Sequence, residues 1–263
     1  MGGEMSVATK HGGSALVVAL LVVSSTLALS VAPATAAVQS DFEVTTDATQ
    51  SGGNITVDGN LSAAGTDDVT FLIQDPADGD VATVTRSVDQ DFTETINLSK
   101  QSFKGGDGDL DEGTATVLVE EASSFTSAEQ SDTFVVDDTL PSATIDDPGN
   151  NADLQSQPTI SGTASDDTAV DTVDVVIKRQ NDSKYYDGSS FVSSKQRIAA
   201  SGTNDWSYNT TANGISADGT YEISLVVNDT ANNTRETVVP QPDGSTTDIS
   251  YTVDSTDPSI NQI

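Results

Sequence analysis

The sequence predicts an all-β protein in which two tandem antiparallel β-sandwiches follow an N-terminal leader. Apolar and polar residues alternate in short stretches, as expected of strands with one buried face. Turn-forming stretches rich in Gly, Asp and Asn separate these strands. The pattern occurs twice, and no stretch after the leader shows the 3.6-residue period of an amphipathic helix. These observations favour a duplicated β-domain over a helical or mixed fold.

Residues 1–36 are predicted to form a secretory signal peptide. Basic residues precede an apolar run over 15–29, and small residues of the A-x-A kind follow at 32–37. We expect cleavage after Ala36 or Ala37, and therefore an extracellular or cell-surface protein. No second apolar run follows, so stable membrane insertion is not expected after cleavage. The alternative is an uncleaved anchor, because the run nearly reaches the roughly 20 residues that span a bilayer.

The first predicted sandwich covers residues 38–140. About seven short strands are expected in it, which is the number typical of an immunoglobulin-like (Ig-like) sandwich. One strand is expected over 81–88. The alternating apolar positions of the others are Phe42 and Val44, Ile55 and Val57, Val69, Phe71 and Ile73, Phe92, Ile96 and Leu98, Ala115, Val117 and Val119, and Phe134 and Val136.

The second predicted sandwich covers residues 141–258 and repeats the pattern of the first. Offsets between matching segments change only where one copy has a longer loop, such as the hairpin at 185–192, and surface loops tolerate insertions. Residues 259–263 repeat the start of the second copy, which predicts the beginning of a third repeat. The matching segments are Val57-Asp58-Gly59 with Ile160-Ser161-Gly162, Asp91-Phe92 with Asp205-Trp206, Gly113-Thr114 with Gly219-Thr220, and Asp137 to Pro141 with Asp254 to Pro258.

Several short motifs of the second copy occur together. They are Pro158 to Ala164, the hairpin Tyr186 to Phe191, Asp205-Trp206, Gly219-Thr220-Tyr221, the turn Asn228 to Asn233, and Thr252 to Pro258. As a set, these motifs resemble the tandem Ig-like repeats of prokaryotic cell-surface proteins and adhesins. The first copy matches less well, because it lacks the aromatic hairpin and the Asn-Asp-Thr-Ala-Asn turn. The resemblance implies a non-catalytic spacer, display or adhesion module and brings no catalytic residues.

The chain is strongly acidic, with 41 acidic and 10 basic residues, a formal charge of -31 and a pI near 4.1. The electrostatic field of such a negatively charged chain repels nucleic acid, whose binding depends on Lys and Arg. The chain has no cysteine, and its single histidine lies in the leader. The mature protein would therefore lack imidazole and thiolate groups for a triad or a zinc site. We predict that it is not an enzyme.

The acidity also predicts a high-salt environment. A compact chain with this charge repels itself in dilute buffer, whereas at about 1 M salt the Debye length falls to roughly 3 Å. The composition resembles that of haloarchaeal proteins. The alternative is an ordinary acidic secreted protein.

Two sets of carboxylates are candidate calcium ligands. Asp107, Asp109 and Asp111 alternate in a Gly-rich loop and offer hard oxygen ligands. The loop departs from an EF-hand at Glu112 and Leu118, where Gly and Glu are expected. The alternative is a solvated acidic loop. Near the domain junction, bridging ions are a second candidate, although clustering of Asp is also expected by chance in this chain. The junction carboxylates are Asp137, Asp138, Asp146, Asp147, Asp166 and Asp167.

Seven N-x-S/T sequons make the chain a candidate secreted glycoprotein. They begin at Asn54, Asn60, Asn97, Asn181, Asn209, Asn228 and Asn232.

Five aromatic residues gather in one stretch of the second copy, around an Asp187-Gly188 turn that favours a two-residue hairpin. They are candidates for a sugar-stacking platform, and the alternative is that they fill the sandwich core. The residues are Tyr185, Tyr186, Phe191, Trp206 and Tyr208, of which the first four are the possible ligand-facing set.

The sequence therefore predicts a non-catalytic secreted or cell-surface glycoprotein module that serves as a spacer, display or adhesion element in high salt. Its expected partners are surface-layer proteins, other extracellular proteins or glycans. The alternative is an accessory, carbohydrate-binding part of a secreted hydrolase whose catalytic domain lies elsewhere.

Overall fold

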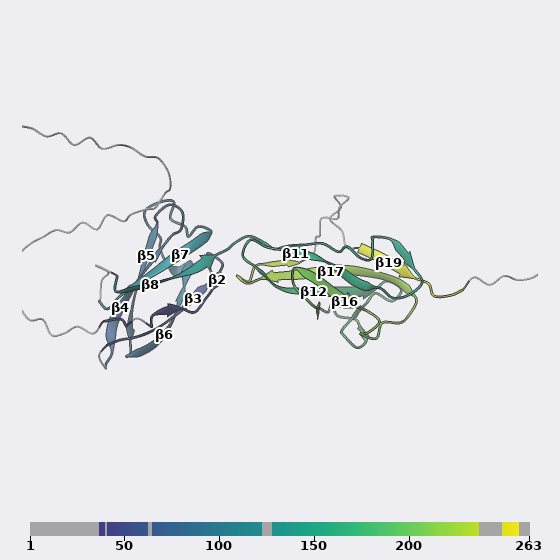
Figure 1. Ribbon diagram of the computed structural model, residues 1–263, viewed down its shortest axis with the longest axis horizontal. Coiled ribbons are helices and arrows are strands. Elements are labelled where there is room, and N and C mark those ends of the chain that lie inside the picture. The colour runs from purple at the N-terminus through teal and green to yellow at the C-terminus, as the bar shows by residue number, and fades with distance from the viewer. Residues whose placement is uncertain (1–36, 40, 63–64, 123–127, 237–248, 258–263) are drawn as a thin grey trace, which may run out of the picture. The chain divides into compact units, whose positions relative to one another are not determined.

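The computed structural model describes residues 37–39, 41–62, 65–122, 128–236 and 249–257 (Figure 1). The predicted leader at 1–36 and the predicted third repeat at 259–263 lie outside these residues. The described chain is nearly all β, with one short 3-10 turn at Leu98–Lys100 (η1). None of its helical segments has the length and apolar character needed to cross a bilayer.

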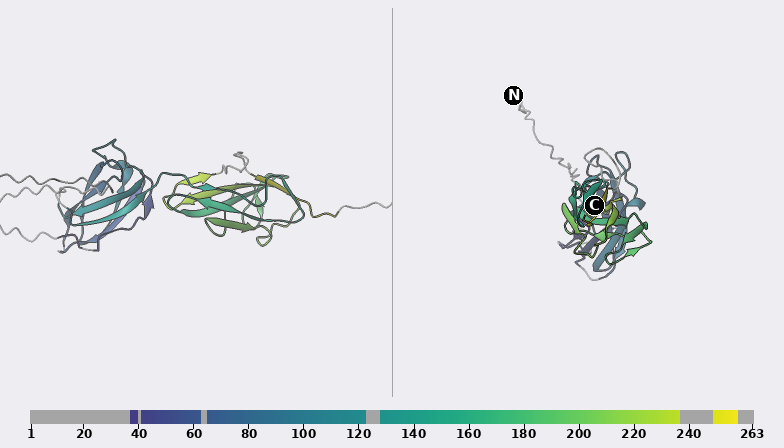
Figure 2. Two further views of the ribbon diagram at one scale, coloured as in Figure 1. Left: turned by 45° about the horizontal axis from the view of Figure 1, so that its top comes forward. Right: turned by 90° about the vertical axis from the view of Figure 1, so that its right-hand side faces the viewer.

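The first sandwich consists of two sheets, as Figure 2 shows. Buried apolar side chains from both sheets form one core. Its most buried side chains include Ile55, Phe71, Ile96 and Val117, all at predicted alternating positions. One sheet has the strand order β1 (Glu43–Val44), β3 (Asn54–Asn60) and β6 (Asp91–Asn97). The other has the order β2 (Ala48–Thr49), β8 (Gln130–Val136), β7 (Gly113–Glu120), β4 (Asp67–Gln74) and β5 (Val81–Val88).

The second sandwich has its own core and the same plan with a larger second sheet. Its smaller sheet has the order β16 (Asp205–Asn209), β11 (Thr159–Ser165) and β9 (Ser142–Ala143). The larger sheet runs β10 (Ala152–Leu154), β19 (Ile249–Val253), β17 (Gly219–Asp229), β12 (Val170–Arg179), β13 (Lys184–Tyr186) and β14 (Phe191–Val192), with β15 (Ile198–Ala199) on β12 and β18 (Thr234–Glu236) on β17. The predicted fold class, two tandem Ig-like β-sandwiches, is confirmed.

The sheets are not wholly antiparallel, which corrects the prediction in one respect. In both sandwiches the first strand is split, so that β1 and β9 pair antiparallel with β3 and β11, whereas β2 and β10 pair parallel with β8 and β19. A chain that crosses from one sheet to the other without reversing its direction meets the last strand in the parallel sense. The two copies therefore share a topological detail that alternation of apolar residues does not reveal.

A glycine–aromatic pair recurs at the same place in both copies. Gly59 lies opposite Phe92 in the β3–β6 ladder, and Gly162 lies opposite Trp206 in the β11–β16 ladder. A Cβ on Gly59 would lie 2.5 Å from the Phe92 ring, and one on Gly162 would lie 1.9 Å from the carbonyl oxygen of Thr144. Close packing across the strands therefore explains why both glycines and both aromatic residues appear in the sequence repeat.

The longer hairpin expected in the second copy is formed by β13 and β14, but its loop is not the predicted two-residue turn. Tyr186 pairs with Phe191, so the loop contains the four residues from Asp187 to Ser190. One carboxylate oxygen of Asp187 accepts the backbone N–H groups of Ser189 and Ser190, at 2.9 and 2.7 Å. This side-chain turn stabilises the wider loop in place of the tight one.

Candidate metal centre

The predicted calcium trio does not meet at one point. Among the described residues, Asp111 is grouped with Asp75 and Asp78, and Asp107 is grouped with Asp78 and Asp80. In each group, one carboxylate oxygen per residue lies within 4.8 Å of the others. Asp109 belongs to neither group, and its backbone N–H donates to Asp107 Oδ1 at 3.1 Å.

The partners that the sequence reasoning missed come from the turn between β4 and β5. Two hydrogen bonds of 3.0 Å between Val81 and Lys104 hold the Gly-rich loop against this turn. Asp75, Asp78 and Asp80 thereby face the loop. The D-x-x-D-x-D spacing of these three residues in a turn was the available signal. By itself, this spacing predicts only a turn.

The carboxylates of this loop cluster, defined as Asp75, Asp78, Asp80, Asp107 and Asp111, mostly accept backbone N–H groups. Asp75 Oδ2 accepts the N–H of Asp111 at 2.6 Å, and Asp78 Oδ2 accepts that of Asp107 at 2.9 Å. The two oxygens of the buried Asp80 accept N–H groups of the glycines at 106 and 108. Desolvation, followed by the charge of Asp75, raises the pKa of Asp111. The cluster therefore organises the two loops with donors of the chain itself.

A second group lies where the segment after β8 meets the second sandwich. Asp137, Asp166 and Asp229 place carboxylate oxygens within 4.8 Å of one another, and we call these three residues the linker cluster. Glu112 and Asp167 form a further group with Asp137. Asp137 and Asp229 are 0% and 1% exposed.

Asp137 is held from several directions. Its Oδ1 accepts the N–H of Thr139 at 2.9 Å, and its Oδ2 accepts the hydroxyl of Thr168. Its backbone carbonyl accepts the side-chain amide of Asn233 at 2.8 Å. Burial raises the pKa of Asp137, against the hydrogen bonds from Thr168 and Thr139, which lower it.

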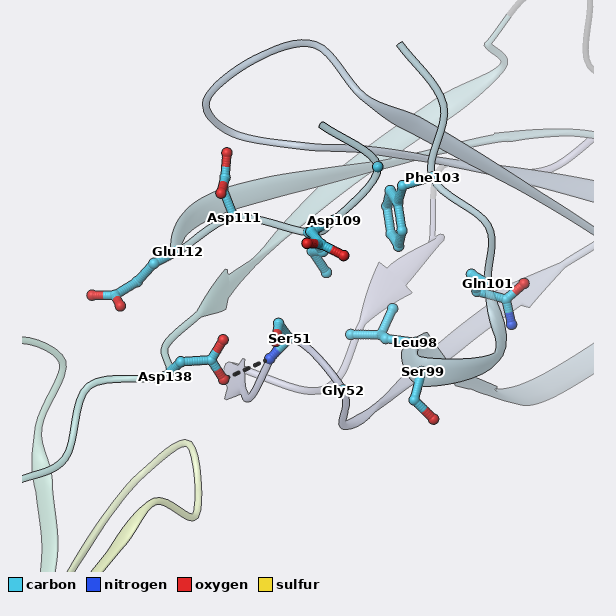
Figure 3. A pocket seen from close by; sticks show the side chains of 12 residues that line it. Ser51, Gly52, Leu98, Ser99, Gln101, Phe103, Asp109, Asp111, Glu112 and Asp138 are labelled. Atoms are coloured by element: carbon cyan, nitrogen blue, oxygen red, sulfur yellow. Dashed lines mark hydrogen bonds between the residues drawn. The ribbon is translucent and has the colours of Figure 1, made fainter. Parts of the chain in front are cut away.

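The other predicted junction carboxylates take different positions. Asp138 Oδ1 accepts the N–H of Ser51 at 3.0 Å, as Figure 3 shows. Asp146 and Asp147 belong to no group of three close carboxylates in the described part of the chain. Of the six predicted residues, the structure therefore brings Asp137 together with Asp167 in one group, which Glu112 joins, and with Asp166 in another, which Asp229 joins. Asp229 belongs to the Asn228 to Asn233 turn, and the sequence spacing of that turn does not predict its approach to Asp137 and Asp166.

An open cavity of about 530 Å³ lies beside the Gly-rich loop of the first sandwich (Figure 3). Leu98, Phe103 and Leu110 supply its apolar lining. Asp111 and Glu112 also line it, but their side chains extend away from Leu98 and Phe103. The cavity thus combines an apolar wall with an acidic edge.

The aromatic stretch of the second copy packs mainly inside the sandwich. Tyr186 and Trp206 are 2% and 1% exposed, so the ligand-facing role predicted for these two residues is incompatible with their burial. Trp206 Nε1 donates to the carbonyl of Thr163 at 3.3 Å. Phe191 is half-buried and packs 5.1 Å from the Tyr186 ring, measured between centroids. Only Tyr185 and Phe191 of the predicted set keep partial exposure.

The seven sequons differ in how accessible their asparagine amides are. Asn54, Asn181, Asn209 and Asn232 are exposed. The half-buried Asn60, Asn97 and Asn228 use their amide nitrogens as donors to Asp91, Asn54 and Thr172.

Residues 141–225 match the family model described as Bacterial Ig domain. No curated protein matches the chain. Among solved structures, the fibronectin(III)-like modules of Clostridium thermocellum CbhA are similar at 15% identity, over 83% of this chain and 92% of that chain, with a TM-score of 0.35. A tetra-tandem repeat from the extending region of a large adhesion protein is similar at 17% identity, over 82% of this chain and 49% of that chain, with a TM-score of 0.31.

Escherichia coli alpha-2-macroglobulin is similar at 9% identity, over 86% of this chain and 14% of that chain, with a TM-score of 0.30. The chain thus spans about half of the adhesion-protein fragment and a small part of the macroglobulin. The family match and the strand pairing together define tandem Ig-like sandwiches.

Proposed function

We propose that the protein is a non-catalytic secreted or cell-surface module that acts as a spacer, display or adhesion element. The observation that carries this proposal is the tandem of two Ig-like sandwiches, each with its own core, the second of which matches the bacterial Ig domain. Two sandwiches in series hold the chain segments before and after them apart, and their loops present side chains to neighbouring molecules. Such domain families are typically non-catalytic.

The working environment in this proposal is extracellular and rich in salt. The formal charge of -31 supports high salt, because screening removes the self-repulsion of the compact chain. Glycosylation at the exposed sequons belongs to the same proposal, and an intact mass equal to that of the bare polypeptide would contradict it. The proposed partners are surface-layer proteins, other extracellular proteins or glycans.

Surface proteolysis of intact cells tests this function. Producing cells are treated with protease in their growth medium, and released peptides are identified by mass spectrometry. We expect peptides from residues 41–236, together with no turnover of chromogenic glycoside and ester substrates by the purified chain. A cytoplasmic protein of the same cells serves as the control for lysis. The proposal would be contradicted if peptides of this chain appeared only when peptides of the cytoplasmic control also appeared. Catalytic turnover that copurifies with the chain would contradict it too.

A further inference from the structure

The loop cluster and the linker cluster differ in what satisfies their oxygens. In the loop cluster, backbone N–H groups reach the buried carboxylates, as at both oxygens of Asp80. In the linker cluster, Asp166 Oδ1 and Asp229 Oδ2 are buried and have no hydrogen-bond partner. Asp229 is 1% exposed, and its other oxygen accepts the N–H of Asn233 at 2.8 Å. Among the described residues, the loop cluster therefore has no buried oxygen without a partner, whereas the linker cluster has two.

Buried carboxylate oxygens without a hydrogen-bond partner are stabilised by a neighbouring positive charge. An ionised carboxylate is costly to bury without a partner, and neighbouring carboxylates repel one another. The ion pairs among the described residues join Lys and Arg to Glu94, Asp182, Glu222 and Glu236, and none includes a linker-cluster residue. A bound cation would satisfy the free oxygens and remove the repulsion at once.

The number and chemistry of the ligands indicate which class of cation fits the site. Oxygens bound to one Ca²⁺ lie 2.3–2.6 Å from it, so two ligands on opposite sides are about 5 Å apart. The three carboxylate oxygens of the linker cluster lie within 4.8 Å of one another, close enough to bind one ion. All three ligands are carboxylates, which suit a hard divalent cation. Mg²⁺ usually keeps several waters and binds only one or two carboxylates, which makes it the poorer fit to a set of three.

We propose that Asp137, Asp166 and Asp229 bind a calcium ion that fixes the segment after β8 to the second sandwich. Asp137 directly follows β8, Asp166 directly follows β11, and Asp229 is the last residue of β17. One ion thereby joins three segments that are distant in sequence. This site does not depend on the proposed surface role, and it differs from the predicted loop site at Asp107, Asp109 and Asp111.

Hydrogen bonds around the site already hold its carboxylates in position without the ion. The hydroxyl of Thr168 donates to both Asp137 and Asp166, and the amide of Asn233 donates to the carbonyl of Asp137. Carboxylates positioned before the ion arrives lose less entropy on binding it. Asp254 follows β19 as Asp137 follows β8, and its Oδ1 likewise accepts the N–H group two residues further along.

The test uses the full chain after removal of metals with a chelator, at constant ionic strength. Calcium is titrated by calorimetry, and the thermal unfolding midpoint is followed in parallel, with Mg²⁺ as the comparison ion. We expect saturable binding with a rise in the midpoint, and a weaker effect of Mg²⁺ at equal concentration. In Asp229→Asn we expect calcium affinity to fall about tenfold or more, because ligand charge sets the affinity of such sites.

One control variant and one further ligand variant make the outcome decisive. Asp78→Asn removes a carboxylate from the loop cluster and should leave the calcium-dependent rise in the midpoint intact. Asp166→Asn removes a second ligand of the linker cluster and should reproduce the effect of Asp229→Asn. In chelator, Asp229→Asn should be at least as stable as the original chain, because it removes a buried charge. The proposal is overturned if calcium gives neither heat nor a rise in midpoint, or if Asp78→Asn abolishes the response and Asp229→Asn retains it.

Discussion

Tyr208 illustrates how single buried groups set the stability of the second sandwich. The side chain is 5% exposed, and its hydroxyl is buried without a hydrogen-bond partner. Desolvation raises the pKa of Tyr208 to about 12. Tyr186 lies in the same core, but its hydroxyl donates to the carbonyl of Asn213. The two tyrosines thus share an environment and differ in whether the hydroxyl is satisfied.

Replacing Tyr208 with Phe is expected to stabilise the protein by about 1 kcal/mol, because the change removes an unsatisfied buried hydroxyl. Tyr186→Phe, the matched control, should destabilise it by about the same amount, because the carbonyl of Asn213 loses its donor. Both effects are measured from denaturant unfolding midpoints. A lower midpoint for Tyr208→Phe would contradict this account of the hydroxyl.

The raised pKa of Tyr208 also predicts how the stability of the protein changes with pH. The unfolded tyrosine loses its proton near pH 10, whereas folded Tyr208 keeps it to about pH 12. The folded state then binds more protons than the unfolded state, so stability falls as pH rises across this window. Tyr208→Phe should show a smaller fall than the original chain when unfolding is measured between these pH values.

At the scale of elements, the glycine–aromatic ladders link the sequence repeat to the strand packing. Gly162 lies beneath Trp206 and against the Thr144 carbonyl, and Gly59 lies beneath Phe92. These positions leave no room for a methyl group. The same direct pairing of a glycine with an aromatic residue in both copies indicates that the cross-strand contact is part of the duplicated unit.

Gly162→Ala is expected to destabilise the protein by about 1–3 kcal/mol, because its Cβ would overlap the carbonyl oxygen of Thr144. Gly149→Ala is the control, since its Cβ would meet no atom within 4 Å. Chemical unfolding of both variants measures the difference. Equal midpoints for the two variants would show that the backbone moves aside without cost.

The strands were predictable because burial on one face forces alternation, as at Val69, Phe71 and Ile73 in β4. The repeat also placed the starts of β6 and β16 and of β7 and β17. The split first strand was not predictable, because two-residue strands such as β2 carry too little periodicity. The carboxylate groups were only partly predictable, because sequence spacing shows Asp107 and Asp111 but not which turn faces them.

At the scale of the whole molecule, the excess of negative charge is the main electrostatic influence on stability. The described ion pairs involve side chains that are all at least 21% exposed, and such surface pairs contribute little. They leave the large excess of carboxylates unbalanced. Long-range repulsion therefore opposes folding, and screening should relieve it.

The thermal midpoint should consequently rise when the salt concentration increases from about 0.01 M to about 1 M, as the Debye length falls from roughly 30 Å to roughly 3 Å. NaCl and KCl should act alike, because screening depends on ionic strength. A midpoint that stays constant or falls with salt would contradict the proposed high-salt environment.

The central claim, that two separate Ig-like cores act in series, is tested most directly by pulling a single molecule from both ends of residues 37–257. We expect two unfolding events in each full extension. Each event should release about 100 residues, or up to about 350 Å of extended chain. One event that releases the whole length, or extension with no force peak, would contradict the account.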